Sequence, residues 1–234
     1  MGPMTVAVAS NFGEDAKQTA TERAYRVLKQ LILDNELPVG TQLLELEAAA
    51  RLGMSRTPVR EAMVRLEQEG MVELRPRHGM RVLPLSGTAL AEIYEVITAL
   101  EGAAAETVAR KGAAAEDILA MRAAVAEMDT ALSRDDLMAW SQADECFHRL
   151  LVKAAGNARL AVLVDQVWDQ SHRARMMTLR LRPKPVDSNK DHAALLEAII
   201  ARDPARSRSI HDAHRRKAAV LLVDLVDRLG LKQF

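Results

Sequence analysis

Residues 88 to 229 form a nearly continuous series of helical patterns, and this series constrains the fold more than any other feature. It contains six amphipathic stretches, at about residues 88–111, 115–133, 135–155, 158–180, 188–202 and 204–229. Residues that break helices separate the stretches, among them Gly112, Asn157 and Pro204. Aromatic residues make up only 3% of the chain, whereas alanine, leucine, methionine and arginine are abundant, which favours helices over strands. The sequence therefore predicts an all-helical bundle here.

The region before residue 85 follows a different plan. Helical patterns are expected at about residues 21–35, 45–52 and 57–69, and two short β-like runs at 71–74 and 80–83. Thr57 is the expected N-cap of the third helix, with Pro58 as its first residue. Three helices followed by a hairpin make a winged helix-turn-helix. The predicted fold is mainly α, with a flexible arm at 1–18, a winged helix-turn-helix at 19–84 and an all-helical domain at 85–234.

Two arginines stand at the start of the third predicted helix, in the stretch "MSRTPVREAMVRLEQEGM". The helix dipole disfavours cations at that end, so Arg56 and Arg60 are poorly placed for helix stability. They are well placed for DNA, because the recognition helix of such a module enters the major groove by its N-terminal end. Residues 51–82 contain seven arginines and four glutamates, although the whole chain has a formal net charge of zero. We interpret this part as a DNA-binding module rather than an ordinary charged surface.

Four polar side chains interrupt the apolar faces of the later helices. Asp144 and His148 are four residues apart, within a stripe that contains Trp140 and Phe147. His192 and His214 lie in the apolar stripes of the last two helices. Burying such groups without partners costs several kcal/mol, so we expect the three helices to bring them together.

One aspartate and three histidines suit a divalent metal ion, with Zn first and Ni, Mn or Fe as alternatives. Three other interpretations stay open. The same polar cluster could bind an organic or fatty acid directly without a metal, the protein could be a metal-dependent hydrolase, or the polar residues could simply be hydrogen-bonded to one another in a structural bundle without a metal. No HExxH motif supports the hydrolase, and Glu145 is expected to point away from the metal face. His211 is expected to lie off the apolar stripe, and Cys146 to be packed inside.

The chain has a single cysteine and neither a secretion signal nor a run of about 18 apolar residues. No membrane association is therefore expected, and a cytoplasmic location is predicted.

The segment "GTQLLELEAAARLGMSRTPVREAMVRLEQEGMVELRPRHGMRV" resembles the DNA-binding domain of the GntR family of bacterial transcription regulators. The resemblance implies that DNA is contacted by Arg56, Thr57 and Arg60 on the recognition helix and by the basic hairpin tip, Arg77, His78 and Gly79. The second helix departs from the family pattern, since Leu46 replaces a polar or basic residue and Ala48 and Ala49 replace a Leu-Ala pair.

The segments "DECFHRLLVKAAGN", "SNKDHAALLEAIIARD" and "IHDAHRR" resemble the FCD effector domain of the FadR subgroup. In metal-binding members of that subgroup the ligands correspond to Asp144, His148, His192 and His214, and the domain senses a small carboxylate. Ile97 stands where an arginine is usual, so Arg173 or Arg175 is expected to bind the effector. The resemblance implies a homodimer on a palindromic operator, with repression relieved by the effector, and no enzymatic activity.

Overall fold

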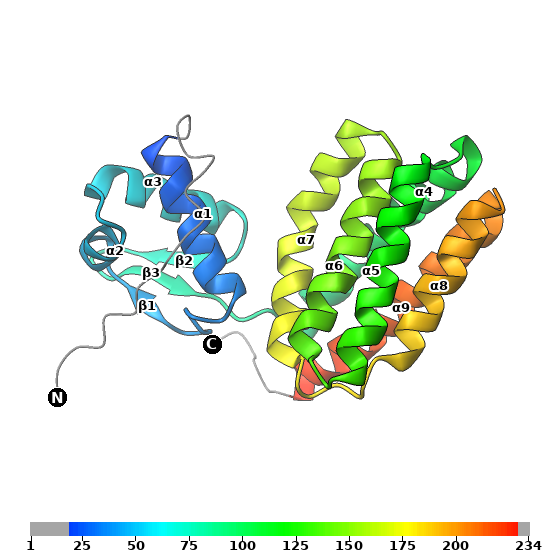
Figure 1. Cartoon of the computed structure of the whole chain (residues 1–234). Coiled ribbons are helices and arrows are strands. Elements are labelled where there is room, and N and C mark those ends of the chain that lie inside the picture. The colour runs from blue at the N-terminus through cyan, green and yellow to red at the C-terminus, as the bar shows by residue number, and fades with distance from the viewer. Residues whose placement is uncertain (1–18, 229–234) are drawn as a thin grey trace. The chain divides into compact units, whose positions relative to one another are not determined.

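The computed structural model describes residues 19–228, and the arm expected at 1–18 lies outside them. The chain divides into two compact units, and it passes from the first to the second between Leu83 and Pro84. Figure 1 shows a small α/β unit and a bundle of long helices. Within the described part of the chain, no helix is long and apolar enough to cross a membrane. A mainly α fold with these two parts is what the sequence predicted.

The first unit is a winged helix-turn-helix. Its elements are α1 (Ala20–Leu33), β1 (Gln42–Leu43), α2 (Glu45–Leu52), α3 (Arg56–Gln68), β2 (Val72–Arg75) and β3 (Gly79–Val82). The strands form an antiparallel sheet in the order β1-β3-β2, and the hairpin β2–β3 pairs Glu73 with Arg81. Leu28, Val59 and Leu66 are buried in its core.

Two helix starts differ from the expected ones. The sequence suggests Thr21 as the cap of α1, but the side chain of Thr19 accepts a hydrogen bond from the backbone N–H of Glu22, at 3.1 Å, so the cap is Thr19. Helix α3 begins at Arg56 with the extended residue Ser55 before it, so the prediction of Thr57 as N-cap was wrong. Pro58 still lies in the first turn, where its missing N–H costs nothing. The shift places Arg56 in the first helical position.

The second unit contains six helices in the described residues. They are α4 (Gly87–Lys111), α5 (Ala115–Ser133), α6 (Leu137–Ala154), α7 (Ala158–Thr178), α8 (Val186–Ile200) and α9 (Pro204–Arg228). These bounds lie within two residues of the expected ones because local signals fix them. Ser86, Asp136 and Asn157 accept hydrogen bonds from the first turns of α4, α6 and α7.

Helix α4 packs most extensively against α9 and also contacts α6, α7 and α8. A fully buried ion pair joins α4 to α9. The Nε of Arg215 donates to Oε2 of Glu101 at 2.7 Å, and its Nη2 donates to Oε1 at 2.8 Å. A partly exposed pair links the same two helices, because Nη1 of Arg208 donates to Oε2 of Glu106 at 2.9 Å.

These two pairs allow a matched stability test. Replacing Arg215 with Leu leaves Glu101 charged inside the bundle, so we expect the free energy of unfolding to fall by about 3–5 kcal/mol. The same substitution at Arg208 should cost about 1 kcal/mol or less, because water screens an exposed pair. Urea denaturation of both variants measures the difference. Equal losses would show that the buried pair has no special role in stability.

A second prediction concerns Gly79, where β3 passes close to the backbone of β1. Gly79 has a φ of 70°, and a Cβ at this position would lie 2.2 Å from the carbonyl oxygen of Leu43. Gly70 has the same φ, but a Cβ there would meet nothing within 4 Å. In both variants the alanine must adopt a left-handed backbone conformation, which is unfavourable for a residue with a Cβ. We expect Gly79→Ala to destabilise the first unit by about 1–3 kcal/mol more than Gly70→Ala, measured by chemical denaturation.

Candidate DNA-reading surface and buried polar site

The N-terminal end of α3 presents its arginines to solvent. The side chains of Arg56 and Arg60 are 67% and 73% exposed, and Thr57 is exposed beside them. Both arginines face Glu45 of α2, at 3.1 Å for Arg56 and 3.7 Å for Arg60. The first turn of α3 contains no acidic residue, so Glu45 is the carboxylate that partly offsets their charge. Such weak, exposed pairs leave the guanidinium groups available to phosphates or base edges.

The tip of the β2–β3 hairpin is also available. Arg77 and His78 are exposed, and Arg77 has a φ of 67°. Gly79 is half-buried because it lies against Leu43. On α2, Leu46 is 66% exposed, whereas Ala48 and Ala49 are buried. Helix α2 therefore presents an apolar side chain, Leu46, to solvent.

The structure brings the four residues Asp144, His148, His192 and His214 together inside the helical unit. All four are buried, and one ligand-type atom from each lies within 4.8 Å of the others. The Nε2 atom of His192 is 3.1 Å from Nε2 of His148 and 3.3 Å from Oδ1 of Asp144. These residues come from α6, α8 and α9. The three helices therefore bring the four side chains together, as the sequence suggested.

The second ring nitrogen of each histidine faces an acceptor. The Nδ1 of His192 lies 2.7 Å from the carbonyl oxygen of Ser188, and the Nδ1 of His148 lies 3.3 Å from Oε2 of Glu101. The Nδ1 of His214 lies 3.6 Å from Oδ2 of Asp191. A hydrogen-bonded partner, such as the one at His192, fixes the ring orientation and directs the other nitrogen of a histidine toward a metal ion. The contacts at His148 and His214 are ion-pair distances rather than hydrogen bonds.

Burial also sets the charge state of the three histidines. It lowers the pKa of His148 to about 3, with the charge of Arg215 acting in the same direction. Burial also lowers the pKa of His192 and of His214 below the usual histidine value. Neutral imidazoles offer the lone pair that a metal needs, so the cluster is in the correct protonation state near neutral pH.

A second group of buried residues lies beside the cluster and was not predicted. It consists of Glu101, His211 and Arg215, which are all almost fully buried. The Nε2 of His211 lies 2.9 Å from Oε2 of Glu101, so the expectation that His211 lies off the buried face of α9 was wrong. The same carboxylate faces His148 and therefore connects the two groups.

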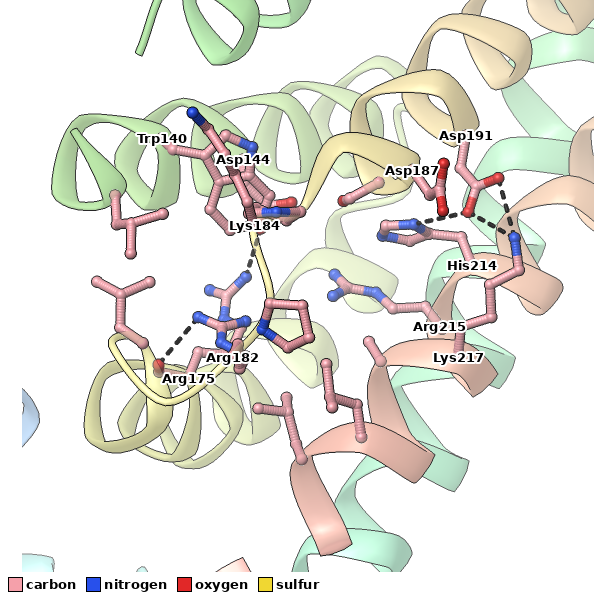
Figure 2. A pocket seen from close by; sticks show the side chains of 18 of the residues that line it. Trp140, Asp144, Arg175, Arg182, Lys184, Asp187, Asp191, His214, Arg215 and Lys217 are labelled. Carbon is pink, nitrogen blue, oxygen red and sulfur yellow. Dashed lines mark hydrogen bonds and ion pairs between the residues drawn. The ribbon is translucent and has the colours of Figure 1, made fainter. Parts of the chain in front are cut away.

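A cavity of about 200 Å³ opens beside Asp144 and His214. Figure 2 shows Arg175 and Arg182 on one side of it and Arg215 on the other. The Nη1 of Arg175 donates to Oδ2 of Asp144 at 2.7 Å. Arg173 is buried but does not line this cavity. Of the two arginines suggested by the sequence, Arg175 is therefore the one beside the polar cluster.

Two further expectations concern α6. Cys146 is exposed rather than packed inside, because α6 turns that position to solvent. Glu145 points away from the cluster as expected, since it lies 3.0 Å from Nδ1 of His172 and 2.8 Å from Nε of Arg149.

Comparisons with known proteins agree with both halves of the structure. The family "Bacterial regulatory proteins, gntR family" matches residues 20–82, and the FCD domain matches residues 92–217. An Agrobacterium vitis protein, "Uncharacterized HTH-type transcriptional regulator in the TAR-I ttuE-ttuC' intergenic region", is 46% identical over 56% of this chain and 78% of its own. A Paenarthrobacter nicotinovorans protein, "Probable D-xylose utilization operon transcriptional repressor", is 32% identical over 74% of this chain and 75% of its own.

Among solved structures, Escherichia coli McbR/YncC has a similar fold, with a TM-score of 0.76 at 20% identity over 89% of this chain and 99% of its own. The relatives are regulators of transcription rather than enzymes, so the hydrolase hypothesis is set aside. The chain belongs to the GntR family of bacterial transcription regulators, with a GntR-type DNA-binding domain followed by an FCD domain.

Proposed function

We propose that this protein is a repressor whose binding to an operator is relieved by a small carboxylate, bound beside a metal ion in the helical unit. The observation that carries this proposal is a cluster of four buried ligand-type residues, two of which, Asp144 and His214, line a cavity that is also lined by arginines. A DNA-binding regulator acts on the chromosome, so we place it in the cytoplasm.

The donor set fits a divalent metal ion. Asp144, His148, His192 and His214 would hold it, and the second ring nitrogen of His192 is already hydrogen-bonded to the carbonyl oxygen of Ser188, which orients that ring. Three nitrogens and one oxygen suit Zn best and also Ni, Mn or Fe. The ion would supply positive charge and open coordination positions to a ligand in the cavity.

We assign the effector carboxylate to Arg175. Its Nη1 is bonded to Asp144, whereas its Nε and Nη2 atoms are buried without a hydrogen-bond partner. These two atoms form one side of the guanidinium fork, which binds a carboxylate with two parallel hydrogen bonds. Ile97 is fully buried in the core, so the position of the usual family arginine offers no charge here.

The proposed regulation follows from a shift between two states of a homodimer. Two DNA-binding units that read the halves of a palindromic operator must keep a fixed spacing. The effector relieves repression only if it binds the DNA-incompetent arrangement more tightly than the competent one. In the metal-free alternative, the histidines and Arg175 would bind the acid directly.

Arg60 provides the test of the DNA-binding surface. We expect Arg60→Ala to weaken operator binding by about 1–3 kcal/mol if the side chain reads a base. Fluorescence anisotropy with DNA selected by the wild-type protein from a random pool measures the change. The control is Arg110→Ala, which removes a similarly exposed arginine from α4 in the helical unit, 61% exposed against 73% for Arg60. Unchanged affinity of the Arg60 variant, or an equal loss in the control, would refute the assignment.

His192 provides the test of the metal site. We expect His192→Ala to weaken Zn²⁺ binding more than about 100-fold, since losing a ligand costs more than losing a residue that only orients a ligand. Operator binding should survive, while release by the effector is lost. The control is His172→Ala, because His172 contacts Glu145 outside the cluster and should keep full metal affinity. Elemental analysis and anisotropy with and without EDTA measure both properties.

The outcomes distinguish effector binding beside a metal ion from direct binding of the acid without a metal. A His192 variant that binds Zn²⁺ and responds normally would refute the site. Wild-type protein that still responds after EDTA treatment would support direct binding of the acid without a metal.

A further inference from the structure

We propose that Glu45 is a specificity-determining residue of the DNA-reading surface. It acts as a positioning residue, whose carboxylate holds the guanidinium groups of Arg56 and Arg60 for base edges and away from phosphates. This inference rests on the DNA-binding part of the proposed function. It goes beyond that part because it concerns how the protein distinguishes its operator from other DNA.

One carboxylate faces both arginines. Glu45 is the first residue of α2, and Arg56 is the first residue of α3. The Nη2 of Arg56 donates to Oε2 of Glu45 at 3.1 Å, and the Nε of Arg60 lies 3.7 Å from Oε1. Arg60 follows Arg56 by four residues, so the two side chains share one face of α3. Each oxygen of the carboxylate therefore serves a different arginine.

The contact with Glu45 leaves the end of the Arg60 side chain for DNA. A guanidinium group has five N–H donors, one on Nε and two on each terminal nitrogen. The nearest approach of Arg60 to Glu45 is through Nε, and Glu45 is the only carboxylate among the described residues that pairs with Arg60. The two terminal nitrogens match the O6 and N7 acceptors of guanine in the major groove. Arg60 can therefore keep its contact with Glu45 while it reads a base.

A phosphate contact makes the opposite demand on these side chains. Binding to DNA of any sequence depends on arginines and lysines that bind phosphates, and such contacts carry no sequence information. An arginine that turns to a phosphate leaves Glu45, whose carboxylate is then unpaired near a phosphate of the same charge. Glu45 therefore disfavours the phosphate-bound arrangement more than the base-bound one. Specificity is a difference between two such affinities.

The surroundings of Glu45 indicate a role in DNA reading rather than in folding. Its side chain is 28% exposed, and both arginines are mostly exposed, so these ion pairs contribute little to stability. The first turn of α3 contains no acidic residue, so that helix supplies no other carboxylate for the two positive charges. A preference of about fivefold for one arginine conformation corresponds to about 1 kcal/mol, which an exposed pair can supply.

The experiment compares Glu45→Gln with the wild type on two duplexes, using full-length protein. One duplex is the operator that the wild type selects from a random pool, and the other is a scrambled duplex of the same length and composition. Fluorescence anisotropy at one fixed salt concentration measures both affinities. We expect the ratio of operator to scrambled affinity to fall about fivefold, because operator binding weakens while binding to scrambled DNA holds or strengthens.

Salt dependence gives a second readout that a purely structural role would not change. An arginine released from Glu45 gains a phosphate in the operator complex. The slope of log affinity against log salt should therefore become steeper by about one in Glu45→Gln.

The matched control is Glu47→Gln, which removes the same charge two residues further along α2. The carboxylate of Glu47 accepts a hydrogen bond from the backbone N–H of Leu44 at 3.0 Å instead of facing the arginines. Glutamine keeps this capping bond, so the affinity ratio and the salt slope should stay unchanged. The melting temperatures of both variants should remain close to that of the wild type, because neither change removes a buried contact.

A double-mutant cycle shows whether Glu45 acts through the arginines. In the Arg60→Ala background, Glu45→Gln should lower the affinity ratio by only about twofold, the part that acts through Arg56. An equal fivefold loss in that background would show that Glu45 acts independently of Arg60 and would overturn the inference.

Two further results would also overturn it. One is an unchanged affinity ratio in Glu45→Gln, and the other is an equal loss in Glu47→Gln. The DNA-binding assignment can fail separately. Unchanged operator affinity in Arg60→Ala refutes that assignment and this inference with it, whereas weakened binding in Arg60→Ala with an unchanged ratio in Glu45→Gln refutes the role of Glu45 alone.

Discussion

The buried ion pair between Glu101 and Arg215 is the interaction on which the helical unit depends. It joins α4 and α9, the two helices that pack together most extensively, at a position without access to water. Placing two charges there costs several kcal/mol in desolvation, which only the bidentate geometry offsets. The pair therefore fixes the register of α9 against α4, and with it the direction in which His214 and Arg215 point.

The same ion pair has consequences for the site. Glu101 faces His148 and His211 as well as Arg215, and Arg215 lines the cavity. One carboxylate thus orients a candidate metal ligand and neutralises an arginine beside the proposed effector. Asp144 has a comparable double role, because Oδ1 faces His192 while Oδ2 accepts from Arg175. Any ligand that moves Arg175 or Arg215 also acts on the groups that orient the histidines.

Sequence patterns predicted most of the fold because local signals mark its boundaries. Caps such as Asp136 and Asn157, and breakers such as Gly112, determine helix ends without help from the rest of the chain. Strand β1 was missed because two residues, Gln42 and Leu43, leave no periodic pattern and are strands only through pairing with β3. The start of α3 was displaced because Ser55 and Thr57 are both acceptable caps by type, and only the backbone distinguishes them.

The buried site was predicted only where a polar residue interrupts a clear apolar stripe. Asp144 and His148 lie in the apolar stripe that contains Trp140 and Phe147, so their burial follows from periodicity. The burial of Glu101 was not predicted because α4 carries alanine on several faces, so its sequence does not show which face is buried. The burial of His211 and Arg215 was not predicted because α9 is highly charged. Its buried face mixes polar residues such as Ser207 with apolar ones such as Leu222, so it shows no clear apolar stripe. Where a helix has no clear apolar stripe, as in α4 and α9, a buried charged residue becomes recognisable only when its partner on another helix is known. The sequence therefore located the candidate metal ligands, whereas the charges around them depend on the packing of α4 against α9.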